Sequence, residues 1–166
     1  MVELGIVGAK NSGKTTLIEK LIRHLVDGGR RVATVKHTSH DHRFDTEGKD
    51  SHRHREAGAG LTIAVSGKEV AVFASPDILE STQIQKLIEQ HIDIWLIEGD
   101  AFSDRPKLLV TRRLVDLKRP YPNNIVATIG PERFDSVAVH FESSDISALG
   151  SFVTETILGC SKEEQL

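Results

Sequence analysis

Residues 8–15 hold the stretch that decides the fold: Gly8-Ala9-Lys10-Asn11-Ser12-Gly13-Lys14-Thr15. This octapeptide is a complete match to the pattern GxxxxGK[ST], the phosphate-binding P-loop. Its glycines allow the backbone to curl around an anion with the N–H groups pointing inward, and the N-terminus of a following helix adds partial positive charge. The pattern is specific when a strand precedes it and a helix follows it.

Both flanks of the P-loop meet that condition. Residues 4–7 form an apolar run that predicts a buried first strand. Residues 15–26 then carry apolar side chains at helical spacing, which predicts an amphipathic helix that ends at Gly28-Gly29. The apolar stripe of this helix comprises Leu17, Ile18, Leu21, Ile22, Leu25 and Val26.

The rest of the chain alternates apolar runs with helical patterns, which predicts an α/β fold. We expect a single-domain P-loop NTPase over residues 1–166, with a mostly parallel central sheet, helices on both faces and a β-hairpin. Further strands are expected at residues 31–35, 92–97, 107–111, 124–129 and 137–141, and the hairpin at residues 61–65 and 69–74. Further helices are expected around residues 51–57, from Ser75-Pro76 to about His91, and from Ser144 or Asp145, before a frayed tail at residues 161–166.

The composition limits which partners and which cellular compartment are expected. The 166 residues carry a net charge of −3, whereas proteins that bind nucleic acid usually have a strong basic excess. Cys160 is the only cysteine, which fits a reducing cytosol. The apolar run after Met1 is too short for a signal-peptide core, and no 18-residue apolar stretch follows. We therefore expect a cytoplasmic protein that binds neither nucleic acid nor a membrane.

The P-loop predicts how a nucleoside triphosphate is held. Lys14 is expected to reach the β- and γ-phosphates, and the Thr15 hydroxyl is expected to ligate Mg²⁺. The predicted nucleotide-binding residues are Gly8, Ala9, Lys10, Asn11, Ser12, Gly13, Lys14, Thr15 and Thr16.

An acidic residue completes the predicted site. The apolar run at residues 92–97 predicts a buried central strand, and Glu98 follows it at the edge of the sheet where open α/β folds bind ligands. Glu98 is expected to act with Thr15 at the metal and, with Lys14, to be catalytic, by holding a magnesium-bound water or polarising the attacking water. Asp100 is an alternative acid, and a solvated turn at residues 98–100 is the alternative without a function.

A polar segment at residues 36–55 follows the second predicted strand. The residues expected to contact the nucleotide, a substrate or a partner, or to act as a switch, are Lys36, His37, Asp45, Asp50 and Arg53. The segment also holds five of the eight histidines: His37, His40, His42, His52 and His54. A metal site in this loop and a polar surface without a ligand are the alternatives.

These motifs together resemble one family. The resemblance covers residues 2–113 and depends most on Gly48-Lys49-Asp50-Ser51, which general GTPases lack. The other matching stretches are Gly8 to Thr15, Val35-Lys36-His37, Phe44-Asp45, Arg53-His54, Ala57-Gly58-Ala59, Leu96-Ile97-Glu98-Gly99, Pro106-Lys107 and Arg112. On these residues the chain is similar to the molybdopterin-guanine dinucleotide biosynthesis adapter proteins, the MobB family of P-loop GTPases.

The resemblance implies a function in molybdenum cofactor biosynthesis. It implies a homodimer that binds GTP with Mg²⁺, hydrolyses it weakly and assists the molybdopterin guanylyltransferase that attaches GMP to the molybdenum-bound pterin. The choice of GTP is implied by the resemblance alone, because the chain contains no guanine-reading [NT]KxD motif. The chain also departs from the family at Asp100-Ala101, where members usually carry an aromatic residue followed by a lysine.

Three other functions stay open at this point. The P-loop and the histidine-rich segment are also compatible with a metallochaperone GTPase that inserts nickel into an enzyme. A small-molecule kinase is the second alternative, with Lys36, Arg53 and Arg55 gripping an acceptor, although no clear lid sequence is found. The third is a binding module in which the nucleotide only shapes a partner surface.

Overall fold

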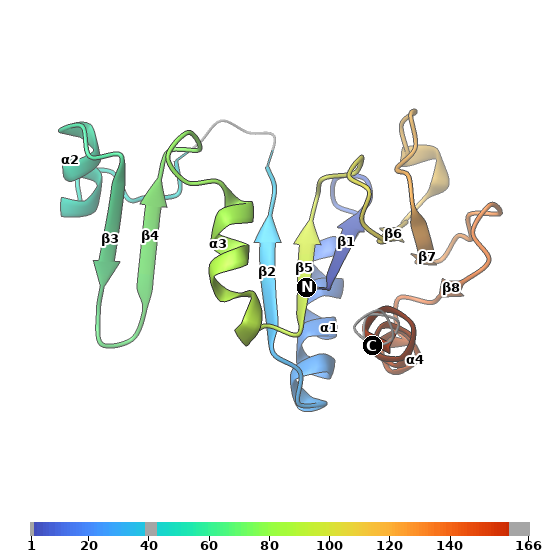
Figure 1. Ribbon diagram of the computed structural model, residues 1–166. Helices are drawn as coiled ribbons and strands as arrows, with labels where there is room; N and C mark the ends of the chain where they lie inside the picture. Colours follow the sequence, from blue (N-terminus) through green and yellow to red (C-terminus); the bar gives the residue numbers. More distant parts are fainter. Residues whose placement is uncertain (1, 39–42, 160–166) are drawn as a thin grey trace. The chain divides into compact units, whose positions relative to one another are not determined.

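The computed structural model describes residues 2–38 and 43–159, and Figure 1 labels their helices and strands. The chain divides into two compact units. The first comprises Met1–His37 and Glu89–Leu166, and the second comprises Thr38–Ile88. The single domain expected over residues 1–166 stays a prediction, because compactness alone does not show that a unit folds independently.

The first unit is built on a six-stranded sheet with the order β2-β5-β1-β6-β7-β8. All neighbouring strands run parallel, and Gly5 of β1 pairs with Ile97 on one side and Lys107 on the other. The strands are β1 (Glu3–Val7), β2 (Val32–Lys36), β5 (Ile94–Glu98), β6 (Lys107–Val110), β7 (Ile125–Ile129) and β8 (His140–Phe141). The central position of β1 brings the P-loop to the middle of the sheet's carboxyl edge.

One face of this sheet packs against helices. The long helix α1 (Lys14–Asp27) contacts α4 (Ile146–Phe152), which continues as a π-helix over Val153–Leu158. The two helices approach closely at Gly150, where a Cβ atom would lie 2.0 Å from the ring of His24. The core of this layer comprises Leu4, Ile6, Leu17, Ile18, Leu21, Leu25, Ile94, Leu96, Leu108, Val110, Ala127, Ile129, Leu149, Val153 and Leu158.

The opposite face of β1 and β6 carries chain crossings instead. Side chains alternate along a strand, so Gly5 points away from the face that Leu4 and Ile6 share with α1. Lys107 and Arg105 fill the space over Gly5, since a Cβ atom there would lie 2.9 Å from Lys107 Cγ and 3.6 Å from Arg105 Cδ. Residues 99–106 run from β5 to β6 without an α-helix, and residues 111–124 run from β6 to β7 with only the short 3₁₀ turn Leu114–Asp116.

The second unit combines two helices with a two-stranded antiparallel hairpin. Its elements are α2 (Asp50–Glu56), β3 (Leu61–Val65), β4 (Val70–Ala74) and α3 (Ser81–Ile88). On one face of the hairpin Phe73 lies under the guanidinium of Arg55, 5.6 Å from its ring centroid. The other face is an exposed apolar surface made of Leu61, Ile63, Val65, Val70 and Val72. This set is called the hairpin face below.

The expected fold class is confirmed: a mostly parallel sheet with flanking helices and a hairpin. The expected helices on both faces are not found over β1 and β6, whose second face carries the crossings at residues 99–106 and 111–124. The expected helix start at Ser75 is wrong, because the Ser75 carbonyl closes a turn and α3 begins only at Ser81. The Gln83 side chain accepts a hydrogen bond from the backbone N–H of Glu80 at 3.0 Å, and this half of a capping box fixes the start. Strand β8 is shorter than expected, and residues 161–166 lie outside the described part of the chain. Within residues 2–38 and 43–159, no helix has the length and apolar content that a membrane crossing requires.

A bidentate ion pair joins the starts of β2 and β5. Asp93 accepts hydrogen bonds from the Arg31 backbone N–H at 2.7 Å and from its guanidinium at 2.9 and 3.2 Å. These contacts lower the pKa of Asp93 from 3.8 to about 2. The pair's contribution to stability is therefore present above pH 3.8 and is lost as the pH falls through about 2.

We expect Asp93→Asn to lower the midpoint of thermal unfolding near pH 7 and to lower it much less near pH 2, where about half of the Asp93 carboxyl groups are already protonated. The effect at pH 7 should be modest, because solvent screens this half-exposed pair. Unfolding followed by circular dichroism across the pH range measures it, with the exposed Asp135→Asn as the matched control. An equal loss of stability at both pH values would show that the carboxylate charge is not responsible.

Candidate functional site

The P-loop joins the end of β1 to the start of α1 in a strongly curved backbone. Three of its residues have positive φ angles: Gly8 (151°), Asn11 (60°) and Gly13 (99°). Glycine is required at position 8, because a Cβ atom there would lie 2.2 Å from the Val110 carbonyl oxygen. The loop backbone therefore lies directly against the end of β6.

Lys14 folds back over this loop. Its ammonium donates hydrogen bonds to the carbonyl oxygens of Gly8, at 3.0 Å, and Ala9, at 2.7 Å. Burial lowers the pKa of Lys14, the negative charge of Glu98 opposes this shift, and the positive charge of Lys36 adds to it. The side chain is thus a partly desolvated cation at the centre of the loop, where an anionic oxygen would stabilise its charge.

Glu98 meets the first turn of α1 at the end of β5. Its two carboxylate oxygens lie 3.4 and 3.5 Å from the Thr15 hydroxyl, and one lies 3.8 Å from Lys36 Nζ. Parallel pairing of β2 with β5 places Lys36 opposite Glu98. A hydroxyl and a carboxylate are the hard oxygen ligands that Mg²⁺ prefers.

The residues around the loop fit a triphosphate with Mg²⁺. The Ser12 hydroxyl is buried and has no hydrogen-bond partner among the described residues, so a polar group of a ligand would satisfy it. A cavity of about 450 Å³ is lined by residues 10–16 together with Lys36 and Glu98. Its charged side chains are Lys10, Lys14, Lys36 and Glu98, so cations outnumber the carboxylate.

The structure brings together most of the expected nucleotide site. Lys10, Asn11, Ser12, Gly13, Lys14, Thr15, Thr16, Lys36 and Glu98 share one cavity. Gly8 and Ala9 line a neighbouring cavity behind the same loop. His37 is connected to the site through its backbone, because its N–H donates a hydrogen bond to the Glu98 carbonyl at 2.9 Å.

The other expected switch or contact residues belong to the second unit. Asp45 is almost completely buried there and accepts hydrogen bonds from Ser51 at 2.9 Å and Arg55 at 3.3 Å. Asp50 and Arg53 form an exposed ion pair at 3.7 Å within α2. These contacts give Asp45 a local structural role, and a switch function for the three residues stays a prediction.

The histidine-rich segment is only partly described. His40 and His42 lie outside the described residues. Among residues 2–38 and 43–159, no three His, Cys, Asp or Glu side chains are grouped so that they could hold a metal ion. The described part of the chain therefore provides no support for a metal site built from the histidine-rich segment.

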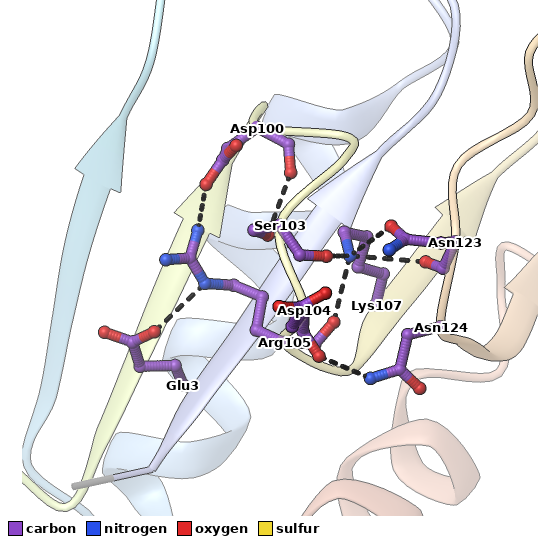
Figure 2. A network of polar contacts seen from close by, with 8 residues as sticks. All are labelled: Glu3, Asp100, Ser103, Asp104, Arg105, Lys107, Asn123 and Asn124. Carbon is purple, nitrogen blue, oxygen red and sulfur yellow. Dashed lines mark hydrogen bonds and ion pairs between the residues drawn. The ribbon is translucent and has the colours of Figure 1, made fainter.

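The sequence patterns predicted no role for a buried lysine on the second face of the sheet. Lys107 is completely buried at the start of β6. Its ammonium donates to the carbonyl oxygens of Ser103, of Arg105 at 3.0 Å and of Asn123 at 3.2 Å, and to the Asn123 side chain at 3.1 Å, as Figure 2 shows. Burial lowers the pKa of Lys107. The one sequence feature that indicates this buried position is a single lysine at the start of an apolar strand.

Comparison with known proteins gives a consistent result. The family model for molybdopterin guanine dinucleotide synthesis protein B (MobB) matches residues 3–130. The chain is 36% identical over 121 residues to the molybdopterin-guanine dinucleotide biosynthesis adapter protein of Haemophilus influenzae, across 72% of this chain and 67% of the relative. It is 29% identical to the adapter protein of Escherichia coli, across 92% and 91% of the two chains.

A solved structure agrees with these sequence matches. The crystal structure of Bacillus subtilis MobB is similar to this chain with a TM-score of 0.76 and 26% identity. The similarity covers 93% of this chain and 98% of the Bacillus chain. It therefore extends well beyond the P-loop.

We expect Gly8→Ala to destabilise the protein by about 3 kcal/mol, because the residue keeps a left-handed φ angle and the new Cβ meets the Val110 carbonyl. Urea unfolding measures the change. Gly67→Ala is the matched control, since Gly67 has open space around its Cβ position and no positive φ. Equal denaturation midpoints for the two variants would contradict this account of the loop.

Proposed function

Because this chain belongs to the family of molybdopterin guanine dinucleotide synthesis protein B, we propose that it binds GTP with Mg²⁺ at the P-loop. In this proposal it acts as an adapter for the guanylyltransferase that attaches GMP to molybdopterin, as the names of its relatives suggest. The observation that carries the proposal is the arrangement of Lys14, Thr15 and Glu98 around one polar cavity. The cytoplasm is the expected location.

The proposal gives each residue of the site a task. The backbone N–H groups of the P-loop and the start of α1 bind the phosphates. Lys14 exchanges its two carbonyl acceptors for phosphate oxygens, and Thr15 with Glu98 holds the metal. Bound Mg²⁺ would neutralise charge on the phosphates. Glu98 also orients the attacking water, while Lys36 keeps the carboxylate in place.

Slow turnover fits an adapter better than an efficient enzyme. No arginine is among the described residues that line the cavity. P-loop GTPases without a supplied arginine hydrolyse GTP at a rate on the order of 10⁻⁴ per second. We therefore assign the bound nucleotide a mainly structural role, in which it fixes the surface that a partner protein recognises.

In this proposal the nucleoside binds in a second cavity beside the phosphate site. This cavity of about 200 Å³ shares Ser12, Gly13 and Thr16 with the phosphate cavity, so the two adjoin. Lys20 and Ser143 also line it and offer polar groups to a base or ribose. Ser143 follows β8 and was not expected from the sequence.

The hairpin face supports the expected homodimer. Its five apolar residues lie on one side of β3 and β4, and Val65 is 75% exposed. A contiguous exposed apolar surface of this kind usually marks a protein interface. A second copy presents the same face, so two hairpin faces can cover each other in a symmetric contact.

We expect Lys14→Ala to weaken binding of a fluorescent GTP analogue at least about a hundredfold, because a charge-assisted contact to the phosphates is lost. Glu98→Gln should still bind the analogue yet hydrolyse GTP at least about a hundredfold more slowly. The exposed Lys68→Ala is the matched control. Unchanged affinity in Lys14→Ala would overturn the site, and tighter binding of ATP than GTP would overturn the choice of base.

We expect Val65→Lys to convert the dimer into a monomer, because the charge would have to be desolvated in the contact between hairpin faces. Sedimentation equilibrium of both proteins at the same concentration measures the change. The control is Glu47→Lys, an exposed position away from the hairpin strands. A dimer that persists in Val65→Lys would place the interface elsewhere.

A further inference from the structure

A larger cavity adjoins the first residues of the P-loop. It has a volume of about 530 Å³ and shares Gly8, Ala9 and Lys10 with the loop. Its remaining walls come from the two crossings on the second face of the sheet, residues 99–106 and residues 111–124. Cavities of this size hold small molecules in many proteins.

The lining combines apolar walls with a positive rim. The apolar side chains are Ala101, Phe102, Leu117, Pro120 and Pro122, and Phe102 is 61% exposed, which is unusual for a large aromatic ring. The charged side chains are Lys10, Lys118, Arg119 and Asp116, so cations exceed carboxylates by two. Such a lining suits a flat ring that also carries an anionic group.

The two walls are clamped together before any ligand binds. The buried ammonium of Lys107 donates to Ser103 and Arg105 in one crossing and to Asn123 in the other. The Asn124 side chain adds a second link, because its amide donates to the Asp104 carbonyl at 2.7 Å. Figure 2 shows both links. Walls held in this way need little ordering when a ligand enters, which favours affinity.

The rim is also held in position. The Arg119 guanidinium lies 5.3 Å from the centroid of the Tyr121 ring, and this ring packs edge-on against Phe134 at 5.3 Å. Stacking restricts the arginine while its N–H groups remain able to bind an anion. Arg119 therefore offers a fixed positive charge at the cavity rather than a freely moving one.

We propose that this cavity binds a phosphorylated fused-ring heterocycle of the pterin class, next to the nucleotide in the P-loop. The ring lies against Phe102 and the two prolines, and the phosphate binds Lys118 and Arg119. The choice of a pterin among flat anionic ligands rests on the proposed function, whereas the cavity and its charges do not. Because Lys10 lines both cavities, the two ligands are neighbours, and the adapter would hold both substrates of the guanylyl transfer.

Fluorescence titration of the full chain tests the second site while GTP and Mg²⁺ saturate the P-loop. The probes are a fluorescent 6-substituted pterin with a phosphate ester, the same pterin without the phosphate, and inorganic phosphate as a competitor. The variants are Phe102→Ala and the double variant Lys118→Gln with Arg119→Gln. Lys68→Gln with Lys86→Gln, two exposed lysines of the second unit, is the charge-matched control.

We expect the double variant to bind the phosphorylated pterin at least about tenfold more weakly and the unphosphorylated pterin as the wild type does. Phe102→Ala should bind both pterins about fivefold more weakly, because the ring loses its aromatic wall. All of these variants should keep the wild-type affinity for GTP, since none of the substituted residues lines the phosphate cavity.

Equal pterin binding by all variants would overturn the second site. Pterin binding that is seen only without GTP, and is lost when GTP and Mg²⁺ saturate the P-loop, would also overturn it, because the pterin would then occupy the P-loop. Pterin binding that depends on the rim residues, in a protein that fails to bind GTP, would support the second site and overturn the proposed function. The two proposals are thus distinguished by one set of titrations.

Discussion

The close contact between the P-loop backbone and the end of β6 is the constraint on which the site depends. Gly8 can lie against the Val110 carbonyl only because it has no side chain. This contact fixes the direction in which the chain leaves β1, and α1 begins from there with Lys14 and Thr15 in its first turn. Glu98 reaches the same point from β5, which is the other neighbour of β1. The candidate metal site is therefore set by three adjacent parallel strands.

The buried Lys107 holds the loops that lie on the face of these strands opposite α1. Parallel strands are usually connected through helices that cover the sheet, yet the crossing between β5 and β6 contains no helix. The Lys107 ammonium supplies hydrogen bonds that the loop carbonyls would otherwise lack, and Arg105 covers Gly5 with its aliphatic stem. Burying an ammonium is costly, and four oxygen acceptors offset that cost. The two ordered crossings thereby cover this face of the sheet and border a cavity.

The sequence alone predicted the features whose signal lies within a few consecutive residues. The pattern at residues 8–15 predicted a curved loop, and the apolar periodicity of residues 15–26 predicted α1, because each signal lies within a few consecutive residues. Glu98 was found because the end of a buried strand is a defined place in this fold class. Lys107 and Ser143 were not assigned roles from their own pattern, since their partners come from distant parts of the chain. The start of α3 was misplaced because Ser75-Pro76 competes with the Glu80 and Gln83 cap.

The strand order has a consequence for how the chain folds during synthesis. Strand β1 is made first but pairs only with β5 and β6, so it has no partner strand until residue 94 and later residues have been translated. The hairpin of β3 and β4 pairs within itself and needs nothing downstream. On the ribosome the hairpin can therefore form before β1 has a partner strand. The P-loop can make its contact with β6 only after more than half of the chain has been translated.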